Sequence, residues 1–223
     1  SERELAYAIN AAAPGIMAEE AKRIDAALIH YSTDYVFDGE KTGPYLESDA
    51  THPLSVYGAS KLAGEQAIQA VGARHLVLRT SWVYGARGNN FLLTILRLAK
   101  ERDELPVVND QIGAPTWSRM IAQATALLIA RWRTSGQSSG ICNLTASGQT
   151  SWHGFARAIL ELLPADEKRR LAPSGLVQIP AAQYPTPARR PRNSVLSHAR
   201  LERDFGLTMP DWKESLRLCI EEV

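Results

Sequence analysis

Short apolar runs alternate with helical patterns of apolar residues along most of the chain. Runs with the length of buried strands cover residues 26–31, 75–79, 106–108 and 141–144. Helical spacing covers residues 1–22, 55–71, 90–100, 118–132, 150–163, 197–205 and 211–222. Strands that alternate with helices predict an α/β fold with a mostly parallel sheet, and the last third of the chain is expected to form a smaller lobe.

Several local signals set the expected ends of these elements. Pro14-Gly15 should interrupt the first helix, because proline lacks the backbone N–H that a helix interior uses. Asn89 or Asn90 can cap the helix at 90–100, and Thr150 or Ser151 the helix that follows. Gly206 is placed to end the helix at 197–205. The remaining segments, 38–53 and 172–192, are expected to be mostly loop.

The composition narrows the class of protein. The 25 basic and 24 acidic residues leave a net charge of +1, which gives no basic face for nucleic acid. Cys142 and Cys219 are far apart without metal-ligand spacing, so reduced thiols are favoured over a disulfide. Because no apolar run approaches the ~20 residues of a membrane span and no signal peptide is recognisable, we expect a cytoplasmic protein.

The candidate chemistry begins with Tyr57 and Lys61. At positions i and i+4 of the expected helix they share one face. A free phenol has a pKa of about 10, and a cation held beside it stabilises the phenolate and lowers that pKa. The pair therefore predicts a tuned acid/base, although a tyrosine and a lysine at this spacing also meet by chance on ordinary helices.

Hydroxyl groups follow two of the expected strands. Ser32 and Thr33 follow the strand at 26–31, and Thr80, Ser81 and Trp82 follow the strand at 75–79. In parallel sheets, ligands bind beyond the carboxyl ends of the strands. A hydroxyl at this edge can bond the same oxygen that Tyr57 protonates, so both strand ends and the helix face are expected at one pocket.

The motifs around these residues resemble those of a known family. STDYVFDG at 32–39 is followed by Pro53-Leu54, Tyr57-Gly58, Ser60-Lys-Leu62 and Gly64-Glu65, and later by RTSWVYG at 79–85, Asn90-Phe91, Asp110-Gln111, Gly113, Pro115-Thr116, Arg190-Pro191 and Asn193-Ser194. This pattern, over nearly the whole chain, is similar to the extended short-chain dehydrogenase/reductases. Within them it is most similar to the dTDP-4-dehydrorhamnose reductase family.

This resemblance implies an NADPH- or NADH-dependent oxidoreductase with a Rossmann-like, doubly wound sheet. The implied reaction reduces the C4 ketone of dTDP-4-dehydro-β-L-rhamnose and completes dTDP-L-rhamnose. Residues 1–135 would be the remainder of the cofactor-binding domain and 136–223 mainly the substrate-binding lobe, with the two interleaved. Some relatives form homodimers with Mg²⁺ at the interface, and no ligands for that ion are identified in this sequence.

The resemblance also implies roles for particular residues. Tyr57 would protonate the C4 alkoxide, Lys61 would hold the nicotinamide ribose and lower the tyrosine pKa, and Thr33 would bond the substrate oxygen. Candidate cofactor contacts are Ser32, Tyr57, Lys61, Thr80 and Trp82. Candidate substrate contacts are Thr33, Asp34, Tyr35, Trp82, Asn90, Gln111, Pro115, Thr116 and Arg190, with Arg189 and Arg192 as further partners for the diphosphate. Structural alternatives stay open: a half-buried loop aromatic for Trp82, ordinary loop residues for Gln111, Pro115 and Thr116, and solvated surface residues for the arginines.

Asp34-Tyr35 helps to choose among relatives of the family. The 4,6-dehydratases of this superfamily usually follow the threonine with an Asp-Glu pair, and here tyrosine replaces the second acid. Reduction without dehydration is therefore the better fit. None of the five histidines has metal-ligand spacing, and none is assigned a role.

One expected feature is missing from these 223 residues. A Rossmann fold carries a Gly-x-x-Gly-x-x-Gly turn after its first strand, where backbone amides hold the pyrophosphate, and this sequence contains no such motif. We therefore expect the residues to derive from a longer reductase and to bind NADPH weakly by themselves. The sheet edge at 26–31 should then be prone to association.

Three alternatives stay open. A non-catalytic binding module similar to the regulatory subunit of methionine adenosyltransferase shares this resemblance, although the intact Thr33, Tyr57 and Lys61 set argues against it. Another nucleotide-sugar reductase or epimerase could use the same set. The third alternative is a folded but inactive fragment.

Overall fold

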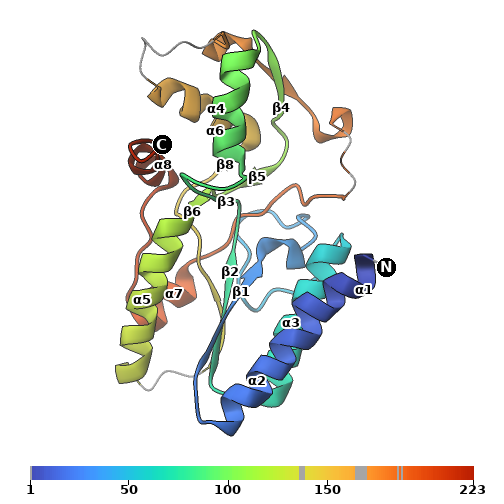
Figure 1. Ribbon diagram of the computed structural model, residues 1–223, viewed down its shortest axis with the longest axis vertical. Helices are drawn as coiled ribbons and strands as arrows, with labels where there is room; N and C mark the ends of the chain where they lie inside the picture. Colours follow the sequence, from blue (N-terminus) through green and yellow to red (C-terminus); the bar gives the residue numbers. More distant parts are fainter. Residues whose placement is uncertain (1, 136–138, 164–169, 185, 187) are drawn as a thin grey trace.

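The computed structural model describes residues 2–135, 139–163, 170–184, 186 and 188–223 (Figure 1). Its α-helices are α1 (Glu2–Tyr7), α2 (Ala13–Arg23), α3 (Val56–Val71), α4 (Phe91–Glu101), α5 (Ser118–Ser135), α6 (Trp152–Leu162), α7 (Ala199–Phe205) and α8 (Trp212–Ile220). Its strands are β1 (Leu28–Thr33), β2 (His75–Thr80), β3 (Val83–Tyr84), β4 (Leu105–Val108), β5 (Ile112–Gly113), β6 (Thr116–Trp117), β7 (Gly140–Asn143), β8 (Thr150–Ser151) and β9 (Leu176–Ile179). No helix in this described part of the chain has the length and apolarity needed to cross a membrane.

A three-stranded parallel sheet, in the order β1-β2-β7, forms the base of the site. Helices α1 to α3 cover one face of it, and α5 and α7 lie on the other (Figure 1). Side chains alternate between the faces: Val77 packs with Ile68 of α3, while Leu76 and Leu78 pack with Leu128 of α5. The predicted α/β class, with helices on both faces of a parallel sheet, is confirmed.

A second layer of packing lies beyond the carboxyl ends of β1 and β2. Helices α4, α6 and α8 bury a cluster around Phe155, Ile159 and Leu92 (Figure 1). The parallel pair β4-β9 closes one side of this lobe. Because α4 precedes residue 135 and β7 of the sheet follows it, each lobe is assembled from both halves of the chain.

Capping residues mark the ends of the helices near the site, and Asn90, Ser151 and Gly206 are ones that the sequence predicts. The Ser55 hydroxyl accepts a hydrogen bond from the Gly58 amide at 3.1 Å and begins α3. Asn90 caps α4 and Ser151 caps α6. Gly206 ends α7 in the left-handed conformation, at φ 58°.

The first strand differs from its expected bounds. It begins at Leu28 and continues to Thr33, not from 26 to 31, because Ser32 and Thr33 pair with Arg79 and Thr80 of β2. The described part of 172–192 is mostly loop, as expected, but it also contains β9, whose residues Leu176–Ile179 pair with β4. Proline-rich flanks hid this four-residue strand from the sequence pattern, and Pro185 and Pro187 lie outside the described residues.

The first helix departs from its expected shape as well. Residues Ala8–Ala12 form a π-helical segment between α1 and α2, and Pro14 lies in the first turn of α2. The interruption therefore comes before Pro14-Gly15, because proline is accommodated in a first helical turn. This segment packs against α3 at Gly64, where an added Cβ would lie 2.0 Å from the Asn10 carbonyl oxygen.

Candidate active site

The first turn of α3 presents Tyr57 beside the end of β1. Its neighbour Gly58 makes this approach close, since an added Cβ would lie 2.2 Å from the carbonyl oxygen of Tyr35. The rings of Tyr35 and Tyr57 then meet edge to face, with their centroids 6.1 Å apart. Because glycine has no side chain, the first turn of α3 can pack directly against the backbone of the segment that follows β1.

Thr33 connects Tyr57 to a buried carboxyl group. The Thr33 hydroxyl donates to Asp34 Oδ1 at 2.9 Å and accepts from the Tyr35 amide at 3.2 Å. The same hydroxyl lies within hydrogen-bonding reach of the Tyr57 phenol, whose pKa it lowers. Because a hydroxyl has one hydrogen, lowering that pKa requires Thr33 to turn this hydrogen from Asp34 to the Tyr57 oxygen when the phenolate forms.

The carboxyl group of Asp34 is almost fully buried, with 3% of the residue exposed. Burial raises its pKa to about 6, and hydrogen bonds from the Ser194 and Thr33 hydroxyls only partly oppose that rise. Asp34 in turn helps raise the pKa of Tyr35 to about 12, although burial of that phenol is the larger cause. The strand end therefore carries an acid that titrates near neutral pH.

Lys61 lies one helical turn after Tyr57, and its ammonium is held by β1. Its Nζ donates to the Tyr31 carbonyl oxygen at 2.6 Å and lies 3.1 Å from Nε2 of His30. Burial lowers the pKa of Lys61, and the Glu65 carboxylate opposes that change.

The sequence predicted that this cation would lower the pKa of Tyr57, and that part of the prediction is wrong. Burial raises the pKa of the Tyr57 phenol above its ordinary value, Asp34 raises it further, and the lowering comes from Thr33. Hydrogen bonds to β1 hold the Lys61 ammonium instead. Tyr57 is consequently a protonated phenol at neutral pH, which is the form that can donate a proton.

A buried ion pair fixes α3 to the sheet behind these groups. Arg79 of β2 donates from Nε and Nη2 to the two carboxylate oxygens of Glu65, at 2.9 and 2.7 Å. The two side chains are 2% and 1% exposed. The Arg79 guanidinium also lies over the ring of Phe37, 5.0 Å from its centroid. This bidentate ion pair fixes the position of α3, and hence of Tyr57 and Lys61, relative to β2.

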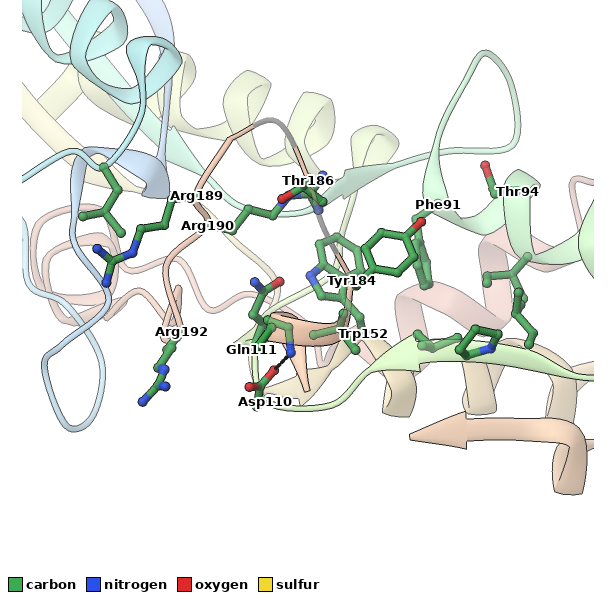
Figure 2. A pocket seen from close by; sticks show the side chains of 18 of the residues that line it. Phe91, Thr94, Asp110, Gln111, Trp152, Tyr184, Thr186, Arg189, Arg190 and Arg192 are labelled. Atoms are coloured by element: carbon green, nitrogen blue, oxygen red, sulfur yellow. Dashed lines mark hydrogen bonds between the residues drawn. The ribbon is translucent and has the colours of Figure 1, made fainter. Parts of the chain in front are cut away.

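A cavity of about 550 Å³ opens between the two lobes. Figure 2 shows its arginines, Arg189, Arg190 and Arg192, toward one end and Phe91 toward the other, with Tyr184 and Trp152 between them. The lining consists of Asp38, Glu40, Leu54, Phe91, Thr94, Ile95, Leu98, Leu105, Pro106, Val107, Val108, Asp110, Gln111, Trp152, Ala181, Ala182, Tyr184, Thr186, Arg189, Arg190 and Arg192. Its size and its mixture of aromatic and cationic groups suit a nucleotide-sized ligand.

Residues next to Tyr57 lie at or near the cavity. Arg190 lies near enough to Tyr35 for its charge to lower the pKa of that phenol. The Tyr35 ring in turn contacts Tyr57, and Leu54, three residues before Tyr57, lines the cavity. Tyr57 itself does not line the cavity, and Tyr35 and Leu54 connect it to the residues that do.

Of the predicted site residues, Gln111, Arg189, Arg190 and Arg192 line the cavity directly. Trp82 lies behind the lining: its ring stacks on Trp152 with centroids 3.6 Å apart and the planes 7° from parallel. Trp82 has a φ of 46°, an unusual conformation for a large side chain, and packs so closely over Gly113 that an added Cβ there would lie 2.5 Å from its ring. The packing on Trp152 and Gly113 holds the indole in this strained conformation.

Other predicted contacts are occupied with bonds inside the protein. Asn90 accepts from the Leu93 amide and donates to the Gly85 and Arg87 carbonyls. The buried Thr116 hydroxyl donates to the Ala114 carbonyl and accepts from the Ala146 amide, and its neighbour Pro115 is buried. Thr80 donates to the Ser32 carbonyl, which joins β1 to β2. These bonds shape the loops that surround the site.

Sequence reasoning missed four residues of the site. Trp152 and Tyr184 come from segments expected to be a helix and a loop, and only the pairing of distant segments brings them to the cavity. The Asn90-Phe91 motif gives no role to Phe91, whose ring lies 4.7 Å from that of Trp152. His30 has no metal-ligand spacing, but its place two residues before Ser32, on the same face of a strand, is a usable signal.

Within the described residues, no group of three or more His, Cys, Asp or Glu side chains is arranged to hold a metal ion. The Mg²⁺ implied for a dimer interface stays a prediction.

Comparisons with known proteins agree with this arrangement. Residues 1–223 match the RmlD substrate binding domain family. The chain is 50% identical over 228 residues to a dTDP-4-dehydrorhamnose reductase of Burkholderia thailandensis, covering 100% of this chain and 76% of that protein. It is 46% identical to one from Escherichia coli, with 100% and 74% covered. The chain thus spans about three quarters of the length of these relatives.

Solved structures give the same result. A dTDP-4-dehydrorhamnose reductase from Clostridium acetobutylicum superposes with a TM-score of 0.89 at 37% identity, over 99% of this chain and 74% of that one. One from Bacillus anthracis, in complex with NADP, gives a TM-score of 0.87 at 34% identity over 100% and 75%. The resemblance stated from the motifs is confirmed, and the chain belongs to the RmlD substrate binding domain family together with these dTDP-4-dehydrorhamnose reductases.

Proposed function

We propose that this chain carries the substrate lobe and the proton-donating groups of a dTDP-4-dehydrorhamnose reductase. The reaction is the reduction of the C4 ketone of dTDP-4-dehydro-β-L-rhamnose to dTDP-L-rhamnose, with NADPH or NADH as reductant. The supporting observation is that Thr33, Tyr57 and Lys61 gather at the end of β1, where Tyr35 links them to the cavity that Arg190 lines. The relatives that are 50% and 46% identical to this chain are named dTDP-4-dehydrorhamnose reductases.

Tyr57 acts as the proton donor in this proposal. Reduction of a ketone builds negative charge on its oxygen, and a positioned acid removes that charge. The raised pKa of Tyr57 keeps its phenol protonated until the alkoxide develops. The Thr33 hydroxyl then donates to the phenolate that remains, and solvent returns the proton.

The residues present fit a nicotinamide dinucleotide on the β1 side of Tyr57. The Lys61 ammonium would hold the ribose hydroxyls, and Ser32 Oγ is buried with no hydrogen-bond partner in the described structure. Both lie at the carboxyl end of a parallel strand, where such ligands bind. When bound, the reduced cofactor supplies the hydride, which no protein side chain can provide.

The cavity suits the nucleotide part of the substrate. Arg189, Arg190 and Arg192 offer guanidinium groups for the two phosphates, whose charge they complement. Trp152 and Tyr184 offer flat rings on which the thymine can stack. This assignment places the sugar toward Tyr35 and Tyr57. A homodimer and a cytoplasmic location stay predictions.

A turnover assay of the intact protein tests the proposal. NADPH consumption followed at 340 nm should depend on dTDP-4-dehydrorhamnose, and the product should be dTDP-rhamnose by mass and NMR. Absence of turnover from a folded protein that binds both ligands would support the binding-module alternative. Turnover only with a different nucleotide sugar, or epimerisation without net oxidation of NADPH, would assign another member of the superfamily.

A further inference from the structure

A histidine that the proposed reaction does not use lies against Lys61. His30 is on β1, two residues before Ser32, on the face of the strand that meets α3. Its Nε2 atom is 3.1 Å from Lys61 Nζ, and the carbonyl oxygen of the next residue, Tyr31, is 2.6 Å from the same nitrogen.

The contact fixes the protonation of the imidazole. An ammonium group has three hydrogens and no lone pair, so Nε2 must be the acceptor and the ring must carry its hydrogen on Nδ1. Burial, and then the charge of Lys61, lower the pKa of His30 to about 4, against a smaller opposing effect of Glu65. His30 is therefore neutral at neutral pH and free to accept this bond.

Two acceptors from one strand constrain the direction of the ammonium. Two of its three N–H groups are used by His30 and Tyr31, and the third makes no hydrogen bond to the described residues. A backbone carbonyl alone would leave a flexible lysine free to rotate about that bond. The second acceptor removes this freedom and aims the remaining N–H away from β1.

We propose that His30 is a positioning residue, which accepts a hydrogen bond from Lys61 so that the free N–H of the ammonium is directed at a hydroxyl-bearing ligand. Under the proposed function, which this inference deepens, that ligand is the ribose of the nicotinamide cofactor. His30 touches neither the substrate nor the reacting atoms and acts through Lys61.

Cofactor binding by the intact protein tests this role. Dissociation constants for NADPH, measured by nucleotide fluorescence, would be compared for wild type, His30→Leu and His30→Gln. The leucine removes the acceptor at similar volume and should weaken NADPH binding about ten-fold, as expected for the loss of one bond to a charged group. The glutamine amide oxygen can reach the ammonium, so that variant should stay within about three-fold of wild type.

A double-mutant cycle separates positioning from general damage to the fold. In a Lys61→Met background, the His30→Leu change should cause no further loss of NADPH affinity, because the group it positions is gone. Additive losses in this cycle would overturn the proposal. So would a folded His30→Leu variant with wild-type affinity, or a folded His30→Gln variant as impaired as His30→Leu.

Two further measurements keep the test decisive. If the leucine variant does not fold, His30→Asn takes its place, since its shorter amide cannot reach the ammonium and the same ten-fold loss is expected. Wild-type turnover of the dTDP-sugar is scored separately. If turnover is absent while NADPH binding shows the predicted pattern, the proposed function fails and the role of His30 stands.

Discussion

Replacement of Glu65 by glutamine should cost this protein a large part of its stability. The change keeps the volume of the side chain but removes the charge that partners Arg79. Because Arg79 and Glu65 are 2% and 1% exposed, water cannot reach the guanidinium that is left behind. Removal of one partner of such a buried pair costs about 3–5 kcal/mol, against a total stability of about 5–15 kcal/mol for a typical domain.

An exposed pair in the same chain provides the control. Arg97 and Glu101 are joined at 2.8 Å, one turn apart on α4, but their side chains are 60% and 50% exposed. The same glutamate-to-glutamine change at Glu101 should cost about 0.3–0.5 kcal/mol, because solvent screens both charges. Both variants would be unfolded in urea and followed by circular dichroism.

A double replacement sharpens the reasoning. Exchange of both partners for apolar residues, as in Arg79→Met with Glu65→Leu, leaves no unpaired charge and should recover most of the loss. If Glu65→Gln cost less than about 1 kcal/mol, or no more than the Glu101 control, the buried-charge argument would be refuted. A double variant as unstable as the single one would show that packing, not charge, sets the cost.

Three other perturbations have definite outcomes. The pKa of Asp34 rises from 3.8 to about 6 on folding, so the folded wild type holds that proton more tightly and loses stability as pH rises from 4 to 7. Asp34→Asn lacks this titration, so its stability relative to wild type should rise by about 3 kcal/mol over the same window. Urea titrations at several pH values would measure the difference, and a difference that does not change with pH would contradict the prediction. Gly58→Ala should destabilise the protein by about 1–3 kcal/mol and slow turnover, because the added Cβ would lie 2.2 Å from the Tyr35 carbonyl oxygen. In the control Gly15→Ala the added Cβ would lie 3.3 Å from the Ala67 methyl group, so the melting temperature should change far less. Trp152→Ala should raise KM for the dTDP-sugar about ten-fold or more with a smaller effect on kcat, and Trp152→Phe should restore most of it; unchanged KM in the alanine variant would remove the indole from the substrate site.

Much of the fold follows from local signals in the sequence. The helix from 55 to 71 has a serine cap, helical apolar spacing and a glycine end, and it appears within one residue of the expected range. The strand at 75–79 has an apolar centre, Leu76–Leu78, and it lies in the middle of the three-stranded sheet with a neighbour paired on each side. These elements are determined largely by nearby residues, so a single sequence suffices to place them.

The site was less predictable, because it depends on contacts between distant segments. The shared face of Tyr57 and Lys61 follows from helix geometry, but the direction of the ammonium depends on His30 and Tyr31 of another element. The partial burial of Tyr57, which raises the pKa of its phenol, likewise depends on neighbours such as Tyr35 from outside α3. The short strand β9 forms only because β4 offers it a partner.

The most direct test of the central claim is the transfer of deuterium from a reduced nicotinamide labelled at its transferable position to dTDP-4-dehydrorhamnose, with wild-type protein and Tyr57→Phe compared side by side. The account predicts deuterium at C4 of the dTDP-rhamnose product, and a rate for the folded phenylalanine variant that is lower by about 10²–10⁴-fold. Product without deuterium at C4, or a Tyr57→Phe variant that turns over at the wild-type rate, would contradict it.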